Sequence, residues 1–83
     1  MNLNNLKIGQ SAIITKVDDK IYGIQRIKEL GFSVGVIVKM VGRSPFNDPL
    51  IVNVRGSDFC IRINLAKKIE VKVIEKDLSN RKS

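Results

Sequence analysis

Residues 36–63 read VIVKMVGRSPFNDPLIVNVRGSDFCIRI and contain the clearest strand and turn signals of the sequence; we call them the decisive stretch. It contains three runs rich in aliphatic and β-branched residues, which favour strands, separated by segments rich in Gly, Pro, Asn and Asp, which favour turns. We therefore predict three consecutive strands, over Val36–Val41, Leu50–Val54 and Asp58–Ile63. Between them the sequence predicts a loop over Gly42–Pro49 and a turn over Arg55–Ser57. The first run is mostly apolar, so we expect a buried strand there.

Two more strands are predicted outward from this stretch, one on each side. Ser11–Val17 (SAIITKV) is rich in β-branched residues, and Ile69–Ile74 (IEVKVI) alternates apolar with charged residues, which is typical of a half-buried strand. Five short strands joined by tight turns predict a mainly β fold, either a small antiparallel barrel or a sandwich. Closing the sheet would also remove exposed strand edges, which matters in a chain of only 83 residues.

One short helix is predicted after the first of these strands, over Ile21–Leu30. Its apolar face consists of Ile24, Ile27 and Leu30. A helix this short does not persist alone, so we expect this face to dock on the sheet. Asp18 and Asp19 suit the N-terminus of the helix by charge, and Gly31 suits the position just past its C-terminus. A single further helical turn is predicted over Asn64–Lys68, capped by its first residue.

The length and the two ends of the chain predict one domain over residues 1–75 and a frayed tail over residues 76–83. The start lacks the apolar core of a signal peptide, and no apolar run approaches the ~20 residues that span a bilayer. We therefore expect a cytoplasmic protein without direct membrane insertion. The single cysteine, Cys60, lies between Phe59 and Ile61, so we expect it to be a small buried apolar residue.

The residue types that several kinds of chemistry require are missing. The chain has no histidine and one cysteine, which excludes the usual structural zinc sites, catalytic triads and iron–sulfur clusters. Neither the P-loop pattern nor GxGxxG occurs, so we see no phosphate-binding glycine loop. We therefore expect a protein that is not an enzyme and has no cofactor, and the metal ligands, if any, are unknown.

Four blocks of residues follow one another along most of the chain. They are Leu3, Leu6 and Gly9; Arg26, Leu30, Gly31 and Gly35; Pro45–Gly56 (PFNDPLIVNVRG); and Ile61, Arg62, Ala66, Ile69 and Val71. In this order and spacing, over about residues 3–74, the sequence resembles the FeoA family, small cytoplasmic proteins of bacterial ferrous iron uptake. The resemblance implies an SH3-like antiparallel β-barrel of about five strands, with one short α-helix inserted after the first long strand.

Several positions in these blocks are expected to support the fold. They are Gly9, Gly31, Gly35, Asp48, Pro49, Gly56, Arg62 and Ala66. Gly31 and Gly35 suit positions that need a positive φ or a close approach of the chain, and Pro49 gives the following strand a stiff start. Arg62 lies inside an apolar strand, so we expect it to pair with an acid or to cap backbone carbonyls.

The resemblance implies a non-enzymatic accessory protein that acts with the membrane ferrous iron transporter carrying a cytosolic GTPase domain. The family is also described as binding transition metal ions. Because this chain lacks histidine and a thiolate cluster, its residues favour protein–protein contact over metal binding.

Six residues are candidates for that contact. They are Tyr22, Arg26, Lys28, Arg43, Phe46 and Arg55. Tyr22 lies roughly opposite the apolar face of the helix, and this polar side is either a contact face or simply solvated. Phe46 either anchors a partner or folds back as a lid on the barrel. Our hypothesis is that the helix and the loop over residues 43–49 form one docking surface.

Other interpretations stay open from the sequence. The formal net charge of +7 favours anionic partners, so the alternative is a small basic β-barrel that binds nucleic acid, although its four aromatics are scattered. The barrel is also related to the SH3-like domain of iron-dependent repressors, but one short helix cannot supply their DNA-binding domain. A homo-oligomer formed through an exposed terminal strand is a further option.

Overall fold

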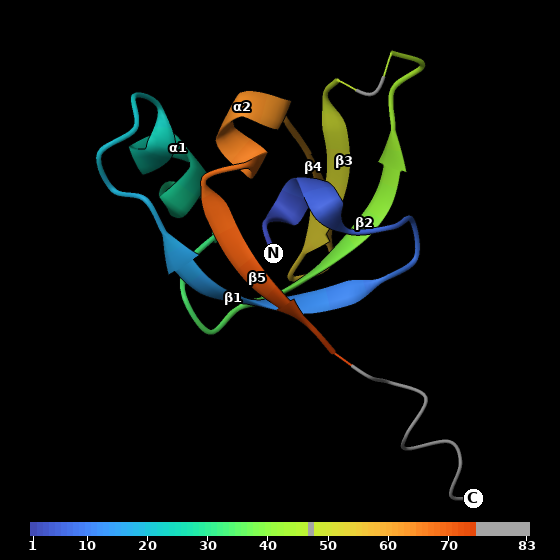
Figure 1. Cartoon of the computed structure of the whole chain (residues 1–83), viewed down its shortest axis with the longest axis horizontal. Helices are drawn as coiled ribbons and strands as arrows, with labels where there is room; N and C mark the ends of the chain where they lie inside the picture. Colours follow the sequence, from blue (N-terminus) through green and yellow to red (C-terminus); the bar gives the residue numbers. More distant parts are fainter. Residues whose placement is uncertain (47, 75–83) are drawn as a thin grey trace, which may run out of the picture.

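One curved antiparallel sheet dominates the part of the chain that the structure describes, residues 1–46 and 48–74 of a computed structural model (Figure 1). Within these residues it has five strands, in the order β4-β3-β2-β1-β5. Their bounds are β1 (Ser11–Val17), β2 (Ile37–Arg43), β3 (Leu50–Val54), β4 (Ser57–Ile61) and β5 (Ile69–Val73). The predicted bounds of β1 and β3 are confirmed at both ends. The frayed tail expected over residues 76–83 lies outside the described residues.

Strand β2 differs from the prediction in the side chains that it buries. In β2, Val38 and Met40 are buried, whereas Ile37, Lys39 and Val41 are exposed. The expectation of a fully buried strand is therefore wrong, because the apolar run alternates between a core face and a solvent face.

The same alternation corrects the placement of Cys60. The thiol is exposed, while the next residue, Ile61, is buried on the opposite face of β4. The expectation of a buried cysteine is therefore wrong. Its apolar neighbours in sequence point away from it, since successive side chains of a strand alternate between faces.

The turn between β3 and β4 is a two-residue hairpin connection. Val54 pairs with Ser57, and the two residues between them, Arg55 and Gly56, have φ of 55° and 88°. Positive φ at both central positions is the geometry whose twist matches the flanking strands. Glycine adopts it without steric cost, and Arg55 is the one non-glycine residue with positive φ among those described.

The helical elements are short and lie over one side of the sheet. They are a 3-10 turn η1 (Leu3–Asn5), α1 (Ile24–Glu29) and α2 (Ile63–Ala66). Helix α1 begins later than predicted because Gly23 adopts a left-handed conformation, φ 89°, at its N-cap. Figure 1 shows α1 and α2 as neighbours, and Leu65 of α2 lies 3.9 Å from where a Cβ on Gly23 would be.

The predicted N-terminal caps of both helices are wrong, whereas Gly31 follows the C-cap residue Leu30 with φ of 113°, as predicted. Asp18 and Asp19 do not cap α1: the Asp18 carboxylate accepts the Lys20 N–H at 3.0 Å, and Asp19 pairs with Lys28 at 2.7 Å. Asn64 is an internal residue of α2, whose N-cap is Arg62.

The core fills the concave side of the sheet and is entirely apolar. Among the described residues no polar side chain is buried, and the largest buried side chain is Phe32, whose ring meets that of Phe59 edge-on at a centroid distance of 6.0 Å. Ile24 and Ile27 of α1 and Leu3 and Leu6 around η1 are buried in the same cluster. The predicted docking of the α1 apolar face is therefore confirmed, with Leu30 packing at its margin.

Residues at the start of the chain cover the outer edge of β5 and are hydrogen-bonded to Arg43 of β2. The Val71 N–H donates to the Met1 carbonyl at 2.8 Å, and Asn2 forms a bridge with Glu70. From β2, the Arg43 guanidinium donates to Asn4 Oδ1 at 3.1 Å and to the Asn4 and Leu6 carbonyls at 2.6 and 3.3 Å. The described sheet is thus not closed by pairing of its edge strands β4 and β5, and the start of the chain covers the free edge of β5.

Candidate functional site

Four of the predicted contact residues gather around α1. Tyr22, just before the helix, is 99% exposed, and Arg26 and Lys28 are on the helix itself. Arg55 approaches from the β3–β4 turn, because its Cδ and Nε lie 3.9 Å from where a Cβ on Gly31 would be. Arg26 and Lys28 are two residues apart and point to different sides of α1, so these residues surround the helix rather than share one face. We call this set the helix patch; it consists of Tyr22, Arg26, Lys28 and Arg55.

The other two predicted contact residues lie on the β2–β3 side. Phe46 is 89% exposed, so in this structure it is not a lid on the barrel. Arg43 is half-buried, and its guanidinium is occupied by the bonds to the segment around η1. The geometry gives Arg43 a role inside the fold, which its position beside a loop did not suggest.

The structure does not bring the two sides together. Figure 1 shows α1 and the loop between β2 and β3 on opposite sides of α2 and β3. The structure therefore gives no support to one continuous docking surface formed by the helix and the loop over residues 43–49, and that hypothesis stays a prediction. The helix patch and Phe46 are separate features, and each has to be tested by itself.

Asp48, from the Asp-Pro pair of the decisive stretch, connects this loop to α2. Its Oδ1 accepts the Ile63 N–H at 3.0 Å, and its Oδ2 lies 3.7 Å from Arg62 Nη1. The Asp48 N–H in turn donates to Ser44 Oγ at 3.0 Å, and the Asp48–Pro49 peptide bond is cis. The carboxylate thus caps a helix to which it is not adjacent in sequence, and the expected pairing of Arg62 with an acid is confirmed.

The predicted glycine positions have the expected backbone. Gly31 and Gly35 have φ of 113° and 93°, values that other residues rarely adopt, and Gly9 and Gly56 are also positive. A Cβ on Gly31 would lie 3.5 Å from Val54 Cγ1, whereas one on Gly35 would meet nothing within 4 Å. Ala66 is fully buried.

Potential metal ligands do not converge in the part of the chain that the structure describes. No group of three or more His, Cys, Asp or Glu residues is close enough there to hold a metal ion. Nor does any helix among these residues have the length and apolar character needed to cross a membrane.

Sequence reasoning missed a charged hollow of about 570 Å³ where the end of β1 faces α2 and the start of β5. Its rim carries Lys16, Lys20, Lys67 and Lys68, together with carboxylates of Asp18, Asp19 and Glu70. The only signal in the sequence was the Lys67-Lys68 doublet, because the other lysines are remote along the chain. A second hollow of about 500 Å³ lies between Ile8, Lys39 and Val41.

Comparison of the chain with known proteins identifies its family. The model of the FeoA domain matches residues 1–73. The chain belongs to the FeoA family. It is 32% identical over 76 residues to a candidate Fe(2+) transport protein A of Methanocaldococcus jannaschii. The aligned region covers 92% of this chain and 90% of that protein.

A second FeoA relative is part of a much longer polypeptide. It is a fusion of Fe(2+) transport protein A with the Fe(2+) transporter FeoB from Porphyromonas gingivalis. Identity is 30% over 80 residues, which is 96% of this chain but 10% of the fusion protein. The chain therefore spans about a tenth of that relative's length.

A solved FeoA structure confirms the fold. Stenotrophomonas maltophilia FeoA, crystallised with zinc and described as a prokaryotic SH3 domain protein, superposes with a TM-score of 0.75 at 36% identity. The match covers 87% of this chain and 89% of that one. The predicted SH3-like class, mainly β with five antiparallel strands, is confirmed by this neighbour and by the observed sheet.

Proposed function

We propose that this chain is a non-enzymatic accessory protein of ferrous iron transport, acting in the cytoplasm through one domain over residues 1–75. It would work by direct contact with a ferrous iron transporter that carries a GTPase domain. The proposal goes beyond family membership in naming the partner, the compartment and the mode of action.

The observation that carries the proposal is the relative in which an FeoA sequence and the transporter FeoB form one polypeptide. A covalent connection holds two modules at a high effective concentration, on the order of millimolar for a short flexible linker. Such a connection is useful when the two modules act on each other. In a separate chain the same contact has to be made by surface residues.

Exposed aromatic residues are the strongest candidates for that contact. Tyr and other aromatics are enriched among residues that dominate binding energy, because they bury a large rigid area. Tyr22 and Phe46 are both almost fully exposed, which leaves their rings free to enter a partner. Contact is favoured over metal binding, because the chain has no histidine and a single cysteine.

The test is co-purification of the tagged full chain with the transporter of its own organism from detergent-solubilised, nuclease-treated membranes at near-physiological salt. We expect specific recovery of the transporter. Recovery of ribosomal or nucleoid proteins alone, lost on nuclease treatment, would instead support the nucleic-acid alternative and overturn the proposal.

Single substitutions then locate the contact. Because Tyr22 precedes α1 and Phe46 follows β2, elements that Figure 1 shows apart, Tyr22→Ala and Phe46→Ala are tested separately. Val34→Ala is the control at another exposed apolar residue. Loss of at least about 1 kcal/mol in one variant, roughly fivefold in affinity, identifies an anchor. If all three variants retain the transporter equally, neither aromatic is the contact.

A further inference from the structure

The hollow at the end of β1 is built by pairing of distant segments. Lys16 and Val17 of β1 stand opposite Glu70 and Ile69 of β5. Just beyond this pairing, the Asp18 N–H donates to the Lys68 carbonyl at 3.1 Å. The β1–α1 segment and the α2–β5 turn are thus held side by side, and their lysines surround one depression of about 570 Å³.

Each carboxylate around this hollow has a hydrogen-bond or ion-pair partner within the fold. Asp19 Oδ1 lies 2.7 Å from Lys28 Nζ on α1. Asp18 Oδ1 accepts the Lys20 backbone N–H at 3.0 Å, and Glu70 Oε1 lies 3.6 Å from the Met1 amino group. Glu70 faces Lys16 across the strands but forms its ion pair elsewhere. Asp19 and Glu70 therefore form their ion pairs with groups outside the hollow.

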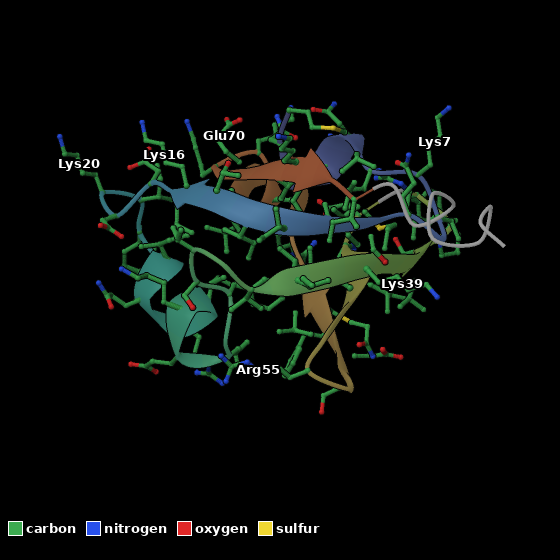
Figure 2. All side chains as sticks on the ribbon, turned by 90° about the horizontal axis from the view of Figure 1, so that it is seen from below. Lys7, Lys16, Lys20, Lys39, Arg55 and Glu70 are labelled. Carbon is green, nitrogen blue, oxygen red and sulfur yellow. The ribbon has the colours of Figure 1, made fainter. Side chains whose placement is uncertain are left out.

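The four lysines of the rim form no ion pair with a described residue, and they outnumber the three carboxylates that line the hollow. Among residues 1–46 and 48–74, no carboxylate lies within ion-pair distance of the ammonium groups of Lys16, Lys20, Lys67 and Lys68. Figure 2 shows the Lys16 and Lys20 side chains extending outward from the same side of the molecule as Glu70, whereas Lys7 and Lys39 lie at the opposite end. In a chain of net charge +7, this hollow concentrates cationic groups at one place.

We propose that this hollow is a docking site for an acidic segment of a partner protein, whose carboxylates would pair with the four lysines. Flexible ammonium groups spread around an open depression suit carboxylates distributed along a peptide. A single phosphate would need donors that converge on one point, such as a glycine loop or an arginine fork. A nucleic-acid strand would need stacking aromatics, and none line the hollow.

This proposal rests on the proposed function only in taking the transporter as the partner that carries the acidic segment. Its first test does not involve the transporter. The full chain, labelled with ¹⁵N, is titrated by NMR with hexaglutamate at low salt, and with the oligonucleotide dT6 in parallel. We expect hexaglutamate to move the amide signals of residues 16, 20, 67 and 68 most, and to bind more tightly than dT6.

A matched pair of variants distinguishes a site from general attraction. Lys16→Gln with Lys20→Gln removes two charges at the hollow, and Lys7→Gln with Lys39→Gln removes two at the opposite end (Figure 2). All four side chains are exposed, so both variants should fold. We expect the first to weaken hexaglutamate binding by about threefold to tenfold and the second by less than about twofold.

Three results would overturn the proposal: equal weakening in both variants, signal changes spread over all the lysines, or tighter binding of dT6 at the hollow. Co-purification of the transporter with the Lys16/Lys20 variant gives the second readout. Undiminished recovery would show that the transporter does not use the hollow. If the unaltered chain recovers no transporter yet binds hexaglutamate at the hollow, the proposed function fails and the acidic-segment site stands.

Discussion

Replacing Asp48 with alanine should destabilise the protein by removing a cap that α2 receives from another part of the chain. Oδ1 of Asp48 accepts the Ile63 N–H at 3.0 Å, and the N-cap residue Arg62 supplies no side-chain cap of its own. A hydrogen bond to a charged group contributes about 1.5–3 kcal/mol, and loss of an N-cap costs about 0.5–2 kcal/mol. The Asp48 side chain is 38% exposed, so water partly replaces it, and we expect a loss of about 1.5 kcal/mol.

Two companion variants separate the hydrogen bond from the ion pair. Asp48→Asn keeps an oxygen acceptor for the Ile63 N–H but loses the charge, so it should cost about 0.5 kcal/mol. Arg62→Gln removes only the partner at 3.7 Å, whose side chain is 69% exposed. Exposed ion pairs contribute about 0–1 kcal/mol, and at this distance we expect less than about 0.5 kcal/mol.

Urea unfolding followed by far-UV circular dichroism measures these differences. Tyrosine emission is a poor probe, because Tyr22 is already exposed in the folded state. With a slope of about 1 kcal/mol per molar urea for a chain of this size, Asp48→Ala should lower the midpoint by about 1.5 M. An Asp48→Ala midpoint within about 0.5 M of the unaltered protein, or equal losses for the alanine and asparagine variants, would refute the capping argument.

Three further predictions concern the backbone, the core and the thiol. Gly31→Ala and Gly35→Ala should each cost about 1–2 kcal/mol, because φ is +113° and +93° at these positions, while a Cβ would make only an ordinary contact at Gly31 and none at Gly35. Calorimetric melting measures both variants, and an unchanged melting temperature in either would contradict the backbone argument. Phe32→Ala should lower the free energy of unfolding by about 3–5 kcal/mol, so that circular dichroism shows a largely unfolded protein at 37 °C. Phe46→Ala, at an exposed residue, should cost less than about 0.5 kcal/mol. A Phe32→Ala protein that is fully folded at 37 °C would contradict this prediction. The exposed Cys60 thiol should react with Ellman's reagent in native buffer about as fast as in urea, and strong protection in native buffer would place it back in the core.

The strands were predictable where composition and alternation agree. Ser11–Val17 and Leu50–Val54 are bounded by turn residues and rich in β-branched side chains, and both were placed correctly. The exposure of Cys60 is also contained in the sequence. Side chains alternate along β4, so Phe59 and Ile61 lie on the face opposite Cys60, and burial of adjacent residues does not predict burial of Cys60. The sequence predicts a helix from Ile21, whereas α1 starts at Ile24, because Gly23 adopts a left-handed conformation that no helical periodicity reveals.

The site was harder to predict because it depends on tertiary pairing. Tyr22 is exposed as predicted, although it precedes the first residue of α1 and helical periodicity does not apply to it. The separation of α1 from the β2–β3 loop depends on where α2 packs between them. The charged hollow depends on the β1–β5 register, which sets Lys16 opposite Glu70 and brings Lys67 and Lys68 to the same rim. No local pattern around Lys16 or Lys20 contains that information.

The position of β1 between β2 and β5 also has a kinetic consequence. Strands β2, β3 and β4 pair with their neighbours in sequence and can form as local hairpins, but one side of β1 is completed only when Ile69–Val73 has been made. Topologies dominated by such distant pairings fold in about milliseconds to seconds rather than microseconds. During synthesis, at about 5–20 residues per second, β1 therefore waits with one open edge until nearly the whole domain has been translated. A chain that stops before Ile69 would keep that edge open, and we expect it to be recognised by chaperones and proteases rather than to persist as a smaller folded unit.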